Sequence, residues 1–308
     1  MRYAFIASAL AVSVNAHGLI SQIYGANGVK MLGCTVTDGT PRNCVANACG
    51  AQADTGIIRD QDIVSKTTGP AGKTQGSGKV DCERTLAIYM GSQSPDSAPT
   101  NKAASSGLDD ILPQGVLLGR GGKSKRGNTK RQAGGLFGGL GGIGQMIGNV
   151  PVVGVLGTGE TLDTSYMGDV EHRVKSTAGN GKKDGLPTAD KNGVVTMGWF
   201  QVNQDGAGPL TAAIDCTSGG KDPNAFKTAQ VVQNAPGSGV SGLSIATLVE
   251  YKVQIKMPKE CQGCSGKLAG VDNVCVARVR NQALAGPFGG SGIFTTSQPA
   301  KRAVDFTA

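Results

Sequence analysis

Aromatic residues and histidine are scarce in this chain of 308 residues, which has one tryptophan, 4% aromatic residues and only two histidines. With so few aromatic rings, a stacked platform for carbohydrate is not obvious in the sequence. No Asn-x-Ser/Thr sequon occurs, so we expect no N-glycans. A GxSxG nucleophile elbow is also missing, and no carboxylate pair stands out at a useful spacing, which disfavours a hydrolase.

Residues 1–16 have the features of a secretory signal peptide. Arg2 provides the positive start, and the apolar stretch "YAFIASALAV" is too short to span a bilayer. The following "VNA" has the small-x-small pattern that signal peptidase cuts. We therefore expect a secreted, extracellular protein whose mature chain begins at His17.

Eight cysteines follow the leader, and an even number in an exported protein indicates disulfides. Four disulfides are expected, although eight cysteines allow 105 pairings. Cys261-x-x-Cys264 has no second CxxC or nearby histidines, so a zinc site is disfavoured.

Glycine is abundant, with 49 residues, and this content favours short strands joined by turns over helical bundles. Strand-like patterns occupy 193–202 and 243–257, and shorter candidates lie at 273–280 and 84–90. The sequence thus predicts a mainly β protein, a disulfide-braced immunoglobulin-like β-sandwich with long loops.

A basic, glycine-rich block at 104–159 interrupts this pattern. It has little that could pack a core, so we expect a disordered insert between the two parts of the sandwich, 17–103 and 160–297. A short tail, 298–308, follows. The uncharged half of the insert, 132–159, could span a bilayer by length, but its glycines make a poor helix and disfavour a membrane partner.

The insert also explains the net charge of +8. Six basic residues lie between positions 120 and 131 without an acid, and the rest of the mature chain is close to neutral. The charge is therefore no argument for a nucleic-acid partner, and we expect a monomer. Lys125-Arg126 and Lys130-Arg131 resemble dibasic processing sites, and disulfides are one way for the two halves to stay joined after a cut.

The two histidines suggest a metal site. An N-terminal His17 would offer its amine and Nδ1 to the same ion, and the imidazole of His172 would complete a three-nitrogen set that suits copper. They can meet only if the fold brings them together. The alternative is that His17 lies at the leader boundary by chance and His172 is a surface residue.

A copper ion held in this way supports redox chemistry, and a nearby side chain commonly orients the oxygen species. The candidates for a catalytic role are Phe200 and Gln201, on a strand that leads into a turn-rich segment. In the alternative interpretation, Phe200 is a core residue and Gln201 is a surface strand residue.

Two long stretches carry a resemblance to a known family. "WFQVNQDGAGPLTAAIDC" (199–216) and "NVCVARVRNQALAGPFGG" (273–290) resemble the marked segments of the Egh-like, appressorium-associated virulence factors of pathogenic fungi. "DTGIIRDQDI" (54–63) and "DCERT" (81–85) are similar to the family's N-terminal half. The resemblance covers most of the chain and implies secretion, expression during host penetration and a role in virulence.

The chain departs from that family in its glycine-rich insert and at Gln204 and Leu210. A leader followed by His-Gly also resembles the start of lytic polysaccharide monooxygenases. This second resemblance implies a copper-dependent oxidase acting on chitin, cellulose or a related wall polymer. The competing hypothesis is a non-catalytic effector or adhesive protein that binds a host or fungal wall surface.

Overall fold

The computed structural model describes residues 17–38, 50–100, 173–204, 206–237, 244, 246–261, 263–283 and 286–296. The strands are β1 (Gly18–Tyr24), β2 (Lys30–Leu32), β3 (Gly56–Ile57), β4 (Lys73–Thr74), β5 (Gly78–Lys79), β6 (Val194–Gln201), β7 (Thr211–Asp215), β8 (Phe226–Gln233), β9 (Val249–Lys256), β10 (Gly266–Leu268), β11 (Val271–Arg280) and β12 (Phe288–Phe294). The helices are α1 (Gly50–Ala53), α2 (Asp60–Val64), α3 (Cys82–Tyr89), α5 (Arg173–Ser176) and α6 (Asn180–Asp184), with 3₁₀ turns at Pro95–Ser97 and Pro223–Ala225.

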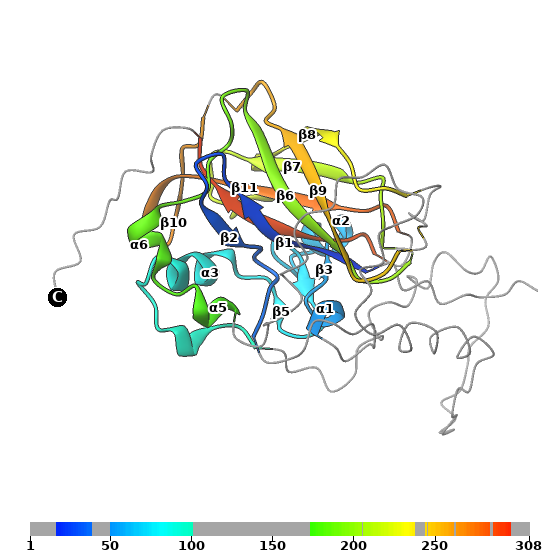
Figure 1. Ribbon diagram of the computed structural model, residues 1–308, viewed down its shortest axis with the longest axis horizontal. Helices are drawn as coiled ribbons and strands as arrows, with labels where there is room; N and C mark the ends of the chain where they lie inside the picture. The colour runs from blue at the N-terminus through cyan, green and yellow to red at the C-terminus, as the bar shows by residue number, and fades with distance from the viewer. Residues whose placement is uncertain are drawn as a thin grey trace, which may run out of the picture.

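These strands form one antiparallel sheet in the order β2-β1-β6-β9-β8-β7-β11-β12-β3-β4-β5, and β10 pairs with β11. Residues 226–229 of β8 pair with β7, whereas residues 230–233 pair with β9, so the two layers of the curled sheet share this strand. The layers enclose one large apolar cluster, which includes Trp199 of β6 and Val279 of β11. The mainly β, disulfide-braced prediction is confirmed, and Figure 1 shows β1 and β6 lying across β11.

The strands predicted at 193–202, 243–257 and 273–280 correspond to β6, β9 and β11. The fourth prediction, a strand at 84–90, is wrong because this segment belongs to α3. Its buried residues Cys82, Thr85, Leu86 and Tyr89 follow a helical spacing of three and four. The Asp81 side chain caps the helix by accepting a hydrogen bond from the Arg84 amide at 2.9 Å.

Three of the four expected disulfides lie in the described residues: Cys34–Cys82, Cys216–Cys261 and Cys264–Cys275. The other two cysteines, Cys44 and Cys49, lie outside the described residues, and both precede the insert. Each described disulfide therefore joins two positions on the same side of the insert. This corrects the expectation that disulfides could join the halves after a dibasic cut, because strand pairing such as β1 with β6 does so instead.

The described chain stops at Thr100 and resumes at Arg173, so the whole insert predicted at 104–159 and His172 lie outside the described residues. The predicted signal peptide and the tail lie outside them as well. Buried Asp38 ties the two ends together. Its amide donates to the Pro99 carbonyl at 2.9 Å, and its carboxylate accepts from the amides of Val174 and Lys175 at 2.8 and 3.1 Å. In the described part of the chain, no helix is long and apolar enough to cross a membrane.

Candidate functional site

His17 lies at the start of β1, against the end of β6. Its carbonyl accepts a hydrogen bond from the Val202 amide at 3.0 Å, which extends the β1–β6 pairing by one residue. The next residue has to be glycine, because a Cβ on Gly18 would overlap the buried Trp199 indole and lie 2.8 Å from the Gly206 carbonyl oxygen. The indole in turn donates to that same Gly206 carbonyl at 2.9 Å. Packing against tryptophan therefore explains the His-Gly start.

One side chain contacts both nitrogens of His17 that a chelated metal would need. The main-chain nitrogen donates to Asn203 Oδ1 at 2.7 Å, and Nδ1 lies 3.2 Å from Asn203 Nδ2. His17 is 0% exposed, whereas Asn203 is half-buried. The main-chain nitrogen and Nδ1 therefore converge on a single place, and the Asn203 carboxamide fills it.

Phe288 covers the imidazole ring. The two ring centroids are 4.6 Å apart, with the planes tilted by 33°. Phe288 is fixed in position because its amide donates to Asn281 Oδ1 at 3.0 Å and because it pairs with Ile57 of β3. His17 is thus held between the turn after β6 and the start of β12.

Arginines lock β3 to the segment that carries Phe288. Arg280 donates to the Ile58 carbonyl at 2.8 Å and forms a two-pronged ion pair with Asp60, at 2.7 and 2.9 Å. In the other direction, Arg59 Nε donates to the Gly286 carbonyl at 3.1 Å. The hydrogen bonds from Arg280 lower the pKa of the Asp60 carboxyl, against the opposing effect of partial burial. The stretches 199–216 and 273–290 therefore both contact His17, and 54–63 binds the segment that carries Phe288.

The arrangement at His17 fits two of the three nitrogens of the expected copper site. A metal ion bound there would replace the Asn203 carboxamide between the amine of a mature His17 and its Nδ1. Within the described ranges, no group of three His, Cys, Asp or Glu side chains could hold a metal. His172 lies outside them, but α5 begins at the next residue, and Val174 of α5 packs in the same apolar cluster as Val202.

The two predicted catalytic residues occupy different environments. Phe200 is 1% exposed and belongs to the apolar cluster of Leu19 and Val202. Gln201 is 0% exposed and is not a surface residue. Its Nε2 donates to the carbonyls of Asn203 at 3.0 Å and Ala246 at 2.7 Å. Gln201 therefore fixes the backbone of the turn that presents Asn203 to His17.

Sequence reasoning gave no role to Asn203 or Phe288, two described side chains that contact the His17 ring and nitrogens. Both lie inside the family-like stretches 199–216 and 273–290. That position was the available signal, although it does not show which of the residues would face His17.

A second buried polar group lies on the same sheet. Glu250 of β9 is 1% exposed; it accepts a hydrogen bond from Ser21 Oγ, and another at 3.3 Å from the Tyr24 hydroxyl. Gly198 leaves room for this carboxyl, because a Cβ there would overlap Glu250 and Ser21. Burial raises the pKa of Glu250, although the Ser21 hydrogen bond and the positive charge of Arg173 oppose the rise.

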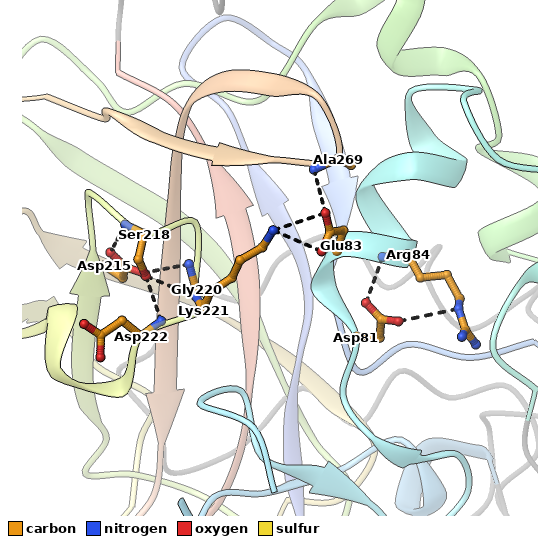
Figure 2. A network of polar contacts seen from close by, with 9 residues as sticks. All are labelled: Asp81, Glu83, Arg84, Asp215, Ser218, Gly220, Lys221, Asp222 and Ala269. Carbon is orange, nitrogen blue, oxygen red and sulfur yellow. Dashed lines mark hydrogen bonds and ion pairs between the residues drawn. The ribbon is translucent and has the colours of Figure 1, made fainter. Parts of the chain in front are cut away.

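A more open polar cluster lies beside α3 (Figure 2). Asp215 orders the turn after β7 by accepting from the amides of Ser218 and Gly220 at 2.8 and 2.6 Å. Burial alone would raise the pKa of Asp215, but these hydrogen bonds outweigh it and lower the pKa. Lys221 reaches from this turn to Glu83 of α3, with both oxygens at 3.2 Å. The charges are paired across the two elements, so the cluster serves to dock α3.

Comparisons with known proteins place the chain in a family. The model of the Egh16-like virulence factor family matches residues 15–289. The chain is 38% identical over 302 residues to the appressoria-specific virulence factor GAS2 of Pyricularia oryzae, which covers 98% of this chain and 91% of the relative. It is also 34% identical over 133 residues to GAS1 of the same fungus, covering 43% of this chain and 50% of the relative. No solved structure matches the chain. The chain therefore belongs to the Egh16-like virulence factor family.

Proposed function

We propose that this protein is exported by a fungus during host penetration and that its mature N-terminal His17 binds copper for oxidative attack on wall polysaccharide. The leader pattern, the disulfides and the relative named for appressoria support export and a role in virulence. The copper site is supported by one observation above the others, the convergence of the His17 main-chain nitrogen and Nδ1 on the Asn203 carboxamide.

In this proposal each residue around His17 has a defined task. Removal of the leader turns the main-chain nitrogen into an amine, and this amine and Nδ1 bind the metal. His172 supplies the third nitrogen. Phe288 fixes the ring plane, and Gly18 lets the chain lie flat on Trp199. When bound, copper would supply the one-electron redox chemistry that oxidises a sugar C–H bond.

Copper titration into protein that begins at His17 tests the proposal. We expect one Cu(II) per chain with authentic protein, and much weaker binding when one extra residue precedes His17, because the amine is then an amide. A His172→Ala variant should lose a ligand and bind copper more weakly. Equal binding by the extended protein would refute the amine ligand, and equal binding by His172→Ala would refute the third ligand.

A non-catalytic effector that binds a wall surface is the second candidate, and the closed surroundings of His17 favour it. A copper ion that acts on a solid polymer needs an open face, whereas Phe288 packs against the His17 ring and His17 is 0% exposed in the chain that still carries residues 1–16. Incubation with reductant, oxygen and a panel of chitin and cellulose substrates separates the two candidates. Oxidised sugars that require His17 support the oxidase, whereas polymer binding without oxidised products supports the effector.

A further inference from the structure

We propose that Asn203 is a latch over the copper site and that the metal enters only when its carboxamide swings away. This inference depends on the copper site of the proposed function. It begins from the occupancy of the site, because Asn203 Oδ1 lies 2.7 Å from the main-chain nitrogen of His17 and Nδ2 lies 3.2 Å from Nδ1. A metal that chelates both nitrogens, at about 2 Å from each, cannot share that place with the carboxamide.

The burial of the two residues places the latch on the solvent side. In the chain that still carries residues 1–16, His17 is 0% exposed. Phe288 packs against the imidazole, and the Val202 amide binds the His17 carbonyl. Asn203 is half-buried, and among these described contacts it is the one made by a polar side chain that reaches the surface. Of these contacts, it is therefore the one that a side-chain rotation can open to a metal ion.

The Asn203 side chain can move without disturbing the backbone of the turn. The Asn203 carbonyl accepts hydrogen bonds from Gln201 Nε2 at 3.0 Å and from the Gly206 amide at 2.9 Å. Neither contact involves the carboxamide. Opening thus requires only rotation about the side-chain bonds, which takes nanoseconds in exposed residues and is faster than metal binding.

A fast latch lowers both the affinity and the association rate of copper by the fraction of open molecules. The dissociation rate is set by the bound state, in which the latch is already open, and should not change. Removal of the two hydrogen bonds should therefore increase the association rate by about 10- to 30-fold. A residue that positions His17 or binds copper would act in the opposite way, since its loss would accelerate dissociation.

The test uses Asn203→Ala, which removes the carboxamide from the place between the two His17 nitrogens together with both hydrogen bonds. Gln204→Ala is the matched control, because Gln204 is exposed and its hydrogen bond with the Ser244 amide is made by its backbone carbonyl. If Asn203→Ala does not fold, Asn203→Ser provides the same test with a side chain too short to bridge both nitrogens. Stopped-flow measurements with Cu(II) give both rates, using full-length protein that begins at His17.

Faster association with unchanged dissociation in Asn203→Ala supports the latch, provided that Gln204→Ala behaves as wild type. The latch is overturned if the association rate is the same in the variant and in wild type. It is also overturned if wild type binds copper more tightly because its dissociation rate is lower. A metal-free measurement keeps the outcome separate from the proposed function. The His17 amine should react with an acylating reagent about 10-fold faster in Asn203→Ala, and equal rates overturn the latch. If neither protein binds copper, the proposed function fails and the acylation rates alone decide the latch.

Discussion

The His17 site and the cluster beside α3 use polar groups in opposite ways. At His17 the polar groups are buried and bound by main-chain or amide partners, and neighbouring glycines leave no room for a side chain. Beside α3, Lys221 and Glu83 form an ion pair in which their side chains are 54% and 50% exposed. Buried contacts of the first kind depend on the exact residue, while exposed pairs contribute little to stability. The packing around His17 should therefore tolerate fewer substitutions than the exposed cluster beside α3.

The largest expected effect is at Gly18. A Gly18→Ala substitution places a Cβ inside the Trp199 indole, so we expect the free energy of unfolding to fall by about 2–3 kcal/mol. Urea denaturation measures this change. Gly69→Ala is the control, because its Cβ would have its nearest neighbour at 4.0 Å and should cost little. A loss in Gly18→Ala no larger than in Gly69→Ala would contradict the packing described for the start of β1.

A smaller loss is expected at Arg280. Arg280→Leu removes the ion pair with Asp60 and the hydrogen bond to Ile58, so we expect a loss of about 1–2 kcal/mol at pH 7, reduced by solvent screening at Asp60. The contacts with Arg280 lower the pKa of folded Asp60. The part of the stability that comes from this pair is therefore present above the unfolded value, about 3.9, and is lost as the pH falls through the folded pKa.

Unfolding of wild type and Arg280→Leu at pH 7 and near pH 2 should thus show a difference that shrinks in acid. Asp60→Asn provides the matched variant, because it keeps the shape of the side chain and removes its charge. A difference between wild type and Arg280→Leu that is the same at both pH values would contradict a role for the Asp60 charge.

Glu250→Gln should have a modest effect of the opposite sign. Burial raises the pKa of Glu250 in the folded protein, so the stability of the protonated form is fully present below the unfolded pKa and is lost as the pH rises through the folded pKa. Glutamine keeps the shape without the charge. The variant should melt at a higher temperature than wild type at pH 8 and at the same temperature at low pH. A lower melting temperature at pH 8 would show that the charged form is stabilised.

The smallest expected effect is at Lys221. Lys221→Met removes the half-exposed ion pair with Glu83, so we expect a loss below about 1 kcal/mol, and a smaller one in about 1 M salt. Thermal melting at low and high salt checks this. A loss of unfolding free energy above about 2 kcal/mol would remove the contrast with the His17 site, because the exposed ion pair would then contribute as much to stability as the buried packing at His17.

Much of the fold could be predicted from the sequence because its signals are local. Apolar runs next to turn residues located β6, β9 and β11, and an even number of cysteines in an exported chain indicated disulfides. The segment 84–90 was misassigned because a short apolar run fits a strand as well as a buried helix. Asp81 as a helix cap and the spacing of Cys82, Leu86 and Tyr89 were the signals that decide it.

The candidate site was predictable only in part. A pattern at the leader boundary selects His17, but the contacts of Asn203 and Phe288 with His17 depend on how β6 and β12 are placed beside β1. Such long-range contacts leave no period in one sequence. Gln201 illustrates the same limit, because the alternative interpretation made it a surface strand residue, whereas it is buried and binds the turn after β6.

Electron paramagnetic resonance of Cu(II) bound to protein that begins at a ¹⁵N-labelled His17 tests the central claim most directly. If the amine and Nδ1 of that residue bind the metal, the nitrogen hyperfine pattern changes with the label. This change should disappear when one residue is added before His17. A pattern that is insensitive to the label, or identical in the extended protein, would contradict the assignment of His17 as the metal-binding N-terminus.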